Sequence, residues 1–358
     1  MPRIVWGDGG RPQKVLRGRP PYLAPILILL AMVVSGLSSC ARESIGDSIP
    51  PEARDQEQQH TTPASSRPLR VALQYGLAYA PLTLVERFDL MEKQMPGMEV
   101  EWVQLGNAAA IREAMLANRL DVGFMGIPPF LIGADRGMEW RIFTGLSEAP
   151  LALITIDPSL MTLEDLEPDH RIAVPQPGSI QHILLSMGAE QAFGDPNRFD
   201  NRLVTLAHPD AMTALLARTE IAAHFASPPY IFEELATDGG HSLMSGREAF
   251  GGTFTFIVGV MRPDAASSRS IEALTVLVAA LEEAIQMLNS ASRAAIEELA
   301  SLYGMSASTL RDYLAHPEMR YTTEVVGVGR FAEAMKRYGY LNNPVDASAL
   351  VTELRRQQ

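Results

Sequence analysis

Two matching segments, a hundred residues apart, point to an internal repeat in this chain. Residues 114–130 read "AMLANRLDVGFMGIPPF" and residues 214–230 read "ALLARTEIAAHFASPPY", with five of seventeen positions identical. Each reads as a helix, a turn, a short buried strand and a new helix, because a run such as residues 122–125 is too short for a helix. Proline is tolerated in the first turn of a helix, so we predict that Pro128 and Pro228 open helices just past strand ends.

Pro-Pro is also common in ordinary turns, so the matching segments alone do not distinguish an internal repeat from a chance match. The rest of the chain provides the further evidence. Two runs, residues 69–125 and 171–226, share the order strand, helix, strand, helix, strand, helix, and this alternation predicts parallel α/β sheets. The matching segments fill the third strand of each run, so we expect two similar lobes, followed by a mostly helical tail from Ser268. The strand candidates are residues 69–74, 100–105, 121–125, 171–175, 202–206, 221–226 and 254–260, and helical patterns include residues 107–118 and 179–193.

The first forty residues carry a different signal. A basic stretch ends at Arg19, an apolar run covers residues 22–34, and "SGLSSC" leads to Cys40. A membrane span needs about 20 apolar residues, so this run favours a secretory signal over the alternative, an uncleaved anchor helix. Cys40 is the only cysteine, which excludes intramolecular disulfides and a thiolate metal site.

Residues 37–40, "LSSC", resemble the lipobox of bacterial lipoproteins. In such proteins the cysteine receives a diacylglyceryl group, with acyl chains such as palmitate, and becomes the new N-terminus. The resemblance implies that residues 1–39 are a signal peptide and that Cys40 is lipidated. The body would then be anchored to a bacterial membrane, outside the cytoplasm, on the cell membrane or its periplasmic side. Residues 40–67 are polar, so we expect a flexible tether there.

The charge balance argues against a nucleic-acid partner. The formal net charge of the 358 residues is −12, and removing the net +4 that precedes Cys40 leaves −16. Such an acidic chain is a poor partner for nucleic acid. Its length suggests about two domains, and its 47% hydrophobic content provides a sizeable core.

Four consecutive stretches resemble the substrate-binding lipoproteins of ABC importers, in the nitrate, sulfonate, taurine and thiamine-precursor group. They are "LAYAPLTLVERFDLMEKQMPGMEVEWVQLG", "AIREAMLANRLDVGFMG", "LEDLEPDHRIAVPQPGS" and "DAMTALLARTEIAAHFASPPY", and they are spread over residues 69–263. One departure is "VERFDLMEK", where the family usually has a glycine before paired aromatic residues. The ligand class therefore does not carry over from this helix.

The resemblance implies an α/β, two-lobed, periplasmic-binding-protein type II-like fold with a ligand cleft between the lobes. Residues 68–157 and 254–358 would form lobe I and residues 158–253 lobe II, with crossovers near residues 156–160 and 251–255. The implied function is a monomeric solute-binding protein that captures a small organic or oxyanion solute by lobe closure. It would deliver this solute to the permease and ATPase subunits of an importer. No cofactor and no catalysis are expected.

Ligands of open α/β sheets bind beyond the carboxyl ends of the strands, where helix N-termini point. Four such loops are residues 75–81, 126–129, 175–181 and 226–229, and none contains a basic residue. Glycine permits close approach and free N–H groups favour an anion or carbonyl, so we expect a neutral ligand or one small anionic group. The predicted ligand-binding residues are Tyr75, Gly76, Tyr79, Ala80, Gly126, Ile127, Pro128, Gly178, Ser179, Ile180, Phe225, Ala226 and Ser227.

Structural roles are the alternative for several of these positions. Ser179 is equally suited to capping its helix, and Phe130 and Tyr230, one residue into a helix, are equally suited to the core. Other motifs are weaker. "GVGRFA" at residues 327–332 imitates a dinucleotide fingerprint, but only 26 residues follow it. The scattered His208, Asp210, His224 and His241 lack metal-ligand spacing, so no metal is expected.

Two other functions remain open from the sequence. One is an enzyme on the same fold, related to menaquinone-pathway proteins or to pyrimidine-precursor synthases. The synthases carry a cysteine-rich motif, which a chain with only Cys40 lacks. The other is a lipoprotein that senses a ligand and presents it to a signalling partner.

Overall fold

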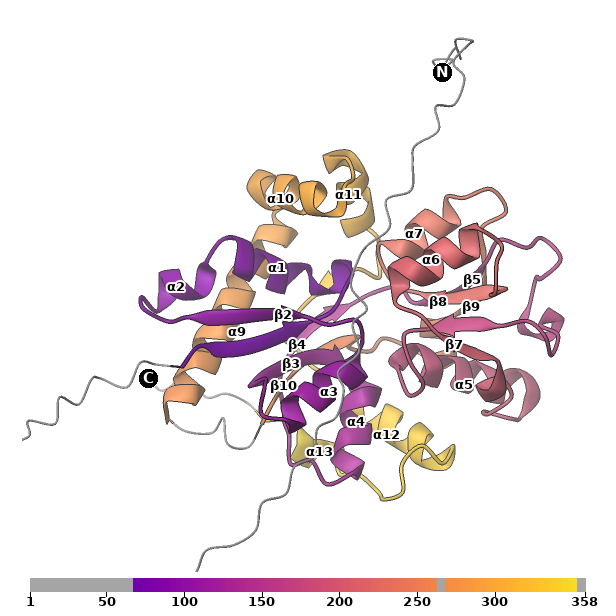
Figure 1. Ribbon diagram of the computed structural model, residues 1–358, viewed down its shortest axis with the longest axis horizontal. Coiled ribbons are helices and arrows are strands. Elements are labelled where there is room, and N and C mark those ends of the chain that lie inside the picture. Colours follow the sequence, from indigo (N-terminus) through magenta and orange to yellow (C-terminus); the bar gives the residue numbers. More distant parts are fainter. Residues whose placement is uncertain (1–66, 263–267, 353–358) are drawn as a thin grey trace, which may run out of the picture. The chain divides into compact units, whose positions relative to one another are not determined.

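The computed structural model describes residues 67–262 and 268–352. The expected signal peptide, Cys40 and almost all of the expected tether lie outside these residues. The described residues belong to one compact unit, which contains every element of secondary structure given below. Figure 1 shows two groups of strands in this unit, each flanked by helices.

The first sheet has six strands in the order β11-β4-β10-β3-β1-β2. Strand β1 is parallel to β2 and β3, whereas β10 is antiparallel to both β3 and β4, and β11 is antiparallel to β4. The bounds are β1 Leu69–Leu73, β2 Val100–Gln104, β3 Val122–Gly126, β4 Arg141–Glu148, β10 Ile257–Met261 and β11 Arg320–Tyr321.

The second sheet has five strands in the order β7-β6-β8-β5-β9. Strand β6 is parallel to β7 and β8, and β5 is antiparallel to β8 and β9. The bounds are β5 Ala152–Thr155, β6 Ile172–Val174, β7 Leu203–Thr205, β8 Ala223–Ala226 and β9 His241–Ser245. In both sheets the third parallel strand pairs with an antiparallel strand from a distant part of the sequence, so the predicted two-lobed α/β architecture is confirmed.

Helices cover both sheets in Figure 1. Around the first sheet they are α1 Ala80–Arg87, α2 Leu90–Gln94, α3 Ala108–Leu116, α4 Ile127–Asp135, α9 Ser268–Asn289, α10 Arg293–Tyr303, α11 Ala307–Leu314, α12 Val328–Arg337 and α13 Ala347–Leu350, with the 3-10 helix η1 Leu77–Tyr79. The second sheet carries α5 Ile180–Phe193, α6 His208–Leu216, α7 Tyr230–Leu235 and α8 Gly246–Phe250, with η2 Leu163–Asp165 and η3 Asp200–Arg202. None of the helices in residues 67–262 and 268–352 combines the length and apolarity that a membrane crossing requires.

All seven predicted strands are present, with ends that differ by three residues or fewer. The prediction that the two strand–helix runs form parallel sheets is confirmed for their six strands, and each sheet also contains antiparallel strands, such as β10 and β5, that lie outside the runs. Strands β4, β5, β9 and β11 were not predicted. Strand β9 is only partly buried and β11 has two residues, so neither shows a clear apolar pattern.

The chain passes between the sheets earlier than expected. Strand β4 ends at Glu148 and β5 begins at Ala152 in the other sheet, so the first passage lies at residues 149–151 rather than at 156–160. Pro150, which has no N–H to donate, separates the two strands. The second passage lies between α8 and β10, at residues 251–256.

The two Pro-Pro turns differ. Helix α4 begins at Ile127 with proline in its first turn, as predicted for Pro128. The prediction for Pro228 is wrong, because the Pro228–Pro229 bond is cis, Pro229 is the N-cap and α7 begins at Tyr230. Pro228 therefore lies in the loop that follows β8.

Candidate ligand-binding site

A small cavity lies between the two sheets, at the carboxyl ends of their parallel strands. Its volume is about 30 Å³, which is room for about one water molecule. All four loops predicted from the sequence contribute to its wall. The lining residues are Gln74, Tyr75, Tyr79, Ala108, Gly126, Pro129, Pro175, Gln176, Ser179, Ile180, Gln181, His208, Ser227, Phe256 and Ile257.

Six of the predicted ligand-binding residues line this cavity: Tyr75, Tyr79, Gly126, Ser179, Ile180 and Ser227. The other seven are neighbours in the chain that do not line it: Gly76, Ala80, Ile127, Pro128, Gly178, Phe225 and Ala226. Phe225 is fully buried in the hydrophobic core, as is Phe130, so their aromatic rings pack rather than line the cavity. Ser179 is the N-cap of α5, where its hydroxyl accepts from the His182 N–H at 3.2 Å.

Sequence reasoning missed Gln176, Gln181 and His208. The two glutamines flank the "PGS" turn in a loop that was predicted correctly, so their polarity was the available signal. His208 was considered only as a metal ligand. Its place in the wall depends on how α6 packs on β8 and α7, which no local pattern reveals.

Gly76 brings the loop after β1 into direct contact with the second Pro-Pro turn. Its φ is +111°, and a Cβ there would lie 2.8 Å from the Pro228 carbonyl oxygen. The next residue, Leu77, donates its N–H to that oxygen at 2.9 Å. The Tyr321 hydroxyl donates to the Leu77 carbonyl at 2.8 Å, which holds the loop from the other side. These contacts join the two loops that contribute Tyr75 and Ser227 to the cavity lining.

Gln176 joins the two sheets and keeps a free donor at the cavity. Its Oε1 accepts from the Ala109 N–H, in the first turn of α3, at 2.7 Å. Only an oxygen can accept from an N–H, so the other amide atom is Nε2, a donor. This Nε2 is buried and has no hydrogen-bond partner within the described residues. A buried donor without a partner costs about 1–3 kcal/mol, so an acceptor atom of a ligand is favoured here.

A chain of buried polar side chains starts at the cavity wall and runs into the second sheet. Gln181 Nε2 lies 3.1 Å from His208 Nε2, His208 Nδ1 lies 2.8 Å from His224 Nε2, and His224 Nδ1 lies 2.5 Å from Glu234 Oε1. Tyr230 stacks on the His208 ring, with centroids 5.7 Å apart. Burial raises the pKa of Glu234 to about 9 and lowers the pKa of His224 to about 3. Burial, with a smaller effect of His224, also lowers the pKa of His208.

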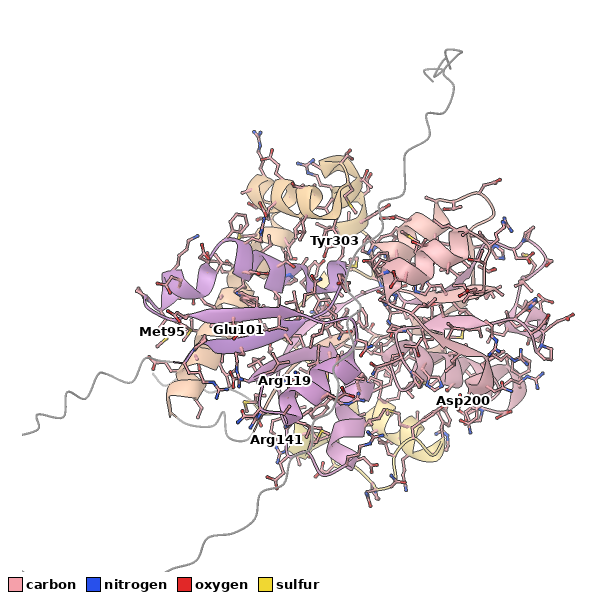
Figure 2. The ribbon with its side chains drawn as sticks, viewed as in Figure 1. Met95, Glu101, Arg119, Arg141, Asp200 and Tyr303 are labelled. Carbon is pink, nitrogen blue, oxygen red and sulfur yellow. The ribbon has the colours of Figure 1, made fainter. Side chains whose placement is uncertain are left out.

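A second polar cluster fastens the C-terminal segment to α5. The Tyr340 hydroxyl lies 2.9 Å from Ser186 Oγ and donates to Asp200 Oδ1 at 3.1 Å. His182 Nε2 lies 2.9 Å from the same Asp200 oxygen. Figure 2 labels Asp200 on the part of the unit built on the second sheet. Because Tyr340 follows α12, which packs on both α4 and α5, this cluster ties the two sheets together.

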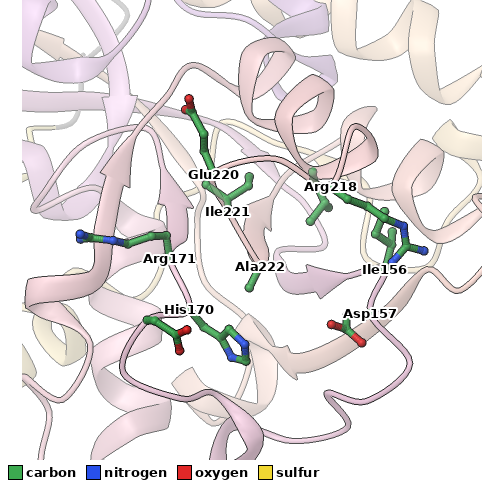
Figure 3. A pocket seen from close by; sticks show the side chains of 10 residues that line it. Ile156, Asp157, His170, Arg171, Arg218, Glu220, Ile221 and Ala222 are labelled. Carbon is green, nitrogen blue, oxygen red and sulfur yellow. The ribbon is translucent and has the colours of Figure 1, made fainter.

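A larger hollow, of about 260 Å³, lies at the opposite ends of β6 and β8 (Figure 3). Arg171 and Ala222, directly before these strands, line it with Asp157, His170 and Arg218. Charges of both signs surround it, and Arg171 and Arg218 are exposed. The described residues contain no group of three or more His, Cys, Asp or Glu side chains arranged to hold a metal.

Comparisons with known proteins agree with this arrangement. An aliphatic sulfonates-binding protein of Escherichia coli, so named provisionally, is 25% identical over 257 residues, which is 71% of this chain and 77% of that protein. The fold is similar to that of the alkanesulfonate-binding protein from Xanthomonas axonopodis pv. citri bound to MOPS, with a TM-score of 0.69, 21% identity and coverage of 81% and 99% of the two chains. It is also similar to the periplasmic nitrate-binding protein from Synechocystis, with a TM-score of 0.60, 14% identity and coverage of 78% and 84%. The model of the NMT1-like family matches residues 63–304, more than half of the chain, and the chain belongs to that family.

Proposed function

We propose that this chain is the extracytoplasmic solute-binding component of an ABC importer. It captures a small solute in the cavity between its sheets and delivers it, unchanged, to a membrane permease with an ATPase partner. The family, the sulfonate-binding relative and the similar folds of sulfonate- and nitrate-binding proteins support this role. The solute is a small organic molecule or oxyanion, of the sulfonate, taurine, nitrate or thiamine-precursor type.

The observation that carries the proposal is the unpartnered Gln176 Nε2 at the cavity. The N-terminal ends of α3, α4 and α5 contribute Ala108, Gly126 and Ser179 to the same wall. Helix N-termini favour negative charge because their first N–H groups have no partner within the helix. A solute oxyanion would accept from Gln176 and interact favourably with these helix ends without a lysine or arginine in the lining.

Binding by the full-length chain is the test of this function. We expect ethanesulfonate, taurine or nitrate to raise the thermal unfolding midpoint, because a ligand that binds only the folded state stabilises it. The Gln176→Glu variant keeps an oxygen for the Ala109 N–H but replaces the free donor with an acceptor. Its affinity for the solute that binds should fall at least about tenfold, or 1.4 kcal/mol, by calorimetry.

Gln104→Glu is the matched control, because Gln104 is exposed on the edge strand β2 and the added charge is the same. It should leave the affinity within about twofold of the unsubstituted chain. If no sulfonate, nitrate or thiamine precursor binds, the proposed solute class is wrong. If Gln176→Glu binds as tightly as Gln104→Glu, Gln176 does not contact the solute.

The proposal includes a lipid anchor. Residues 1–39 would be removed, Cys40 would carry the acyl chains, and residues 40–67 would tether a monomeric body to the membrane. The support is the "LSSC" sequence after an apolar run of signal length. Mass spectrometry of protein extracted from membranes should find a diacylglyceryl mass on a peptide that begins at Cys40. A mature protein that still begins at Met1 would contradict the anchor.

The two sheets with their helices would act as the lobes. The sequence places lobe I at residues 68–157 and 254–358 and lobe II at residues 158–253. We propose the same division with its first boundary moved to residues 149–151, because β5 is hydrogen-bonded into the five-stranded sheet. Solute would enter as the lobes separate, because the cavity of about 30 Å³ is small for an organic solute.

A further inference from the structure

We propose that His182 couples the cavity loop, residues 175–179, to the contact between the sheets at Tyr340, so that the loop is fixed in its solute-binding shape while the lobes are together. The inference rests on the proposed function, because it concerns the same cavity and the same closure. His182 is a buried residue in the first turn of α5 and does not line the cavity. It is therefore a positioning residue, which acts on the solute through the loop.

The cavity loop is a tight turn whose central peptide group needs a partner. Ser179 donates its N–H to the Gln176 carbonyl at 3.1 Å, which closes a four-residue turn. Pro177 and Gly178 are its central residues, and Gly178 has a φ of +75°, as the third residue of a type II turn requires. Turns of types I and II differ in the orientation of the central peptide group, so an acceptor for the Gly178 N–H selects one of them. Gln176 and Ser179, at the ends of the turn, both line the cavity.

The His182 ring provides that acceptor. Gly178 donates its N–H to His182 Nδ1 at 2.9 Å. A backbone N–H can only donate, so Nδ1 carries the lone pair and the hydrogen of the neutral ring is on Nε2. Nε2 lies 2.9 Å from Asp200 Oδ1, an acceptor, which agrees with this tautomer. The two nitrogens of the ring therefore have fixed and different roles.

Tyr340 reaches the same ring from the proposed lobe I. Its hydroxyl lies 3.2 Å from His182 Nε2, and the two rings meet edge to face with centroids 5.1 Å apart. Separation of the lobes would remove both the hydroxyl and the ring of Tyr340 from His182. Asp200, whose side chain is 41% exposed, would then be the remaining partner on the Nε2 side. The ring would be held less firmly, and so would the Gly178 N–H.

Two substitutions separate the two contacts of the ring. In His182→Asn the side-chain oxygen is bonded to Cγ, as Nδ1 is, so it can still accept from Gly178, but the side chain is too short to reach Tyr340. In His182→Gln the amide extends to the position of Nε2, and the acceptor at the position of Nδ1 is lost. His170→Gln is the matched control, because His170 Nδ1 also accepts a backbone N–H, from Glu167 at 3.1 Å, and His170 does not line the cavity.

The first arm of the experiment needs no solute and measures hydrogen exchange at the Gly178 amide of the full-length chain by NMR. We expect Tyr340→Phe to raise the exchange rate at least about tenfold. Tyr313→Phe, which keeps its ring contact with Phe232, should leave the rate within about threefold. An exchange rate that is the same in Tyr340→Phe and Tyr313→Phe would overturn the coupling.

A double substitution shows whether the effect passes through the histidine ring. In His182→Asn the Gly178 contact no longer depends on Tyr340, so adding Tyr340→Phe to this variant should raise the exchange rate less than about threefold. An equal rise in both backgrounds would mean that separation of the lobes alone exposes the amide. That result would also overturn the coupling.

The second arm measures the affinity for ethanesulfonate by calorimetry. His182→Gln leaves the Gly178 N–H without its acceptor, so the dissociation constant should rise at least about tenfold. His182→Asn should bind at least about threefold more tightly than His182→Gln, and His170→Gln should bind within about twofold of the unsubstituted chain. A role in folding stability alone would lower the free energy of unfolding of His182→Gln without changing its affinity.

The outcomes separate two failures. If ethanesulfonate does not bind the unsubstituted chain, the sulfonate assignment of the proposed function is wrong, and hydrogen exchange alone decides whether His182 couples the loop to Tyr340. If ethanesulfonate binds and His182→Gln binds it as tightly as His170→Gln, the proposed function stands and His182 does not position the loop. Circular dichroism checks that each variant is folded, and the exchange measurements on His182→Asn do not depend on His182→Gln.

Discussion

At the scale of single residues, burial governs the chemistry of this protein more than charge pairing does. Glu234 and His224 lie side by side in the interior, yet the dominant influence on each is the loss of water. Burial keeps both groups neutral at pH 7, in contrast to a surface pair that would form an ion pair. Titration of these two residues therefore contributes to folding stability in opposite directions.

The pH dependence of stability follows from these shifts. The folded pKa of Glu234, about 9, exceeds its ordinary value of 4.5, so its contribution is complete below pH 4.5 and is lost as pH rises toward 9. His224 acts oppositely, because its folded pKa of about 3 lies below 6.5: its contribution is present above pH 6.5 and is lost as pH falls toward 3. The Glu234→Gln substitution removes the contribution of Glu234 to the pH dependence of stability and leaves that of His224.

We therefore expect the free energy of unfolding of the unsubstituted chain, relative to Glu234→Gln, to fall between pH 5 and pH 9. The fall should be at least about 1.4 kcal/mol, the equivalent of one pKa unit. Urea denaturation of both proteins at pH 5, 7 and 9 measures it. A difference that stays constant across this range would show that Glu234 is ionised in the folded protein at neutral pH.

At the scale of elements, a single loop contact joins the two sheets at the cavity. Gly76 occupies a backbone conformation that residues with a side chain rarely adopt, and this conformation lets Leu77 donate to the Pro228 carbonyl. The contact depends on both loops, one after β1 and one after β8. The matching strands β3 and β8 carry the two Pro-Pro turns, but only the second turn takes part in this contact.

Gly76→Ala should weaken this connection. The added Cβ would lie 2.8 Å from the Pro228 oxygen and the φ of +111° would be strained, so we expect a loss of about 1–3 kcal/mol in the free energy of unfolding. Gly106→Ala is the control, because nothing lies within 4 Å of its added Cβ and its φ is ordinary. Equal unfolding free energies for the two variants in urea would show that the Gly76 loop adapts without cost.

The elements also show what a sequence alone can predict here. Local apolar runs and the turns after them identified β1, β3, β6 and β8, and with them the four loops that line the cavity. The antiparallel strands β5 and β10 depend on pairing between distant segments, so their direction was not predictable from local periodicity. Gln176 and His208 were missed for the same reason: the first contacts α3 of the other sheet, and the second owes its position to packing.

At the scale of the whole folded unit, contacts on two sides hold the sheets around the small cavity. On one side the segment after α12 reaches α5, where the Tyr340 hydroxyl meets Ser186 and Asp200 and its ring lies 5.1 Å from the His182 ring. On the other side Tyr313 of α11 packs on Phe232 of α7, with ring centroids 4.6 Å apart. If a solute binds only the closed arrangement, separation of the lobes at these contacts lowers its apparent affinity.

Small-angle scattering tests this closure on the full-length chain. Tyr340→Phe keeps the ring against His182 but removes the hydroxyl, and should shift the free protein toward an open form with a larger radius of gyration. Tyr313→Phe is the matched control, because the Tyr313 ring contact survives and its hydroxyl makes no hydrogen bond within the described residues. Saturating solute should return Tyr340→Phe to the radius of the unsubstituted chain, with a several-fold weaker affinity, since part of the binding free energy would now close the lobes.

One outcome would contradict separation of the lobes at this contact. The scattering of Tyr340→Phe would be the same with and without a solute that calorimetry shows to be bound, and it would equal that of Tyr313→Phe. Solute would then have to enter by movement of loop side chains alone, such as that of Tyr75, a residue that lines the cavity and is 41% exposed.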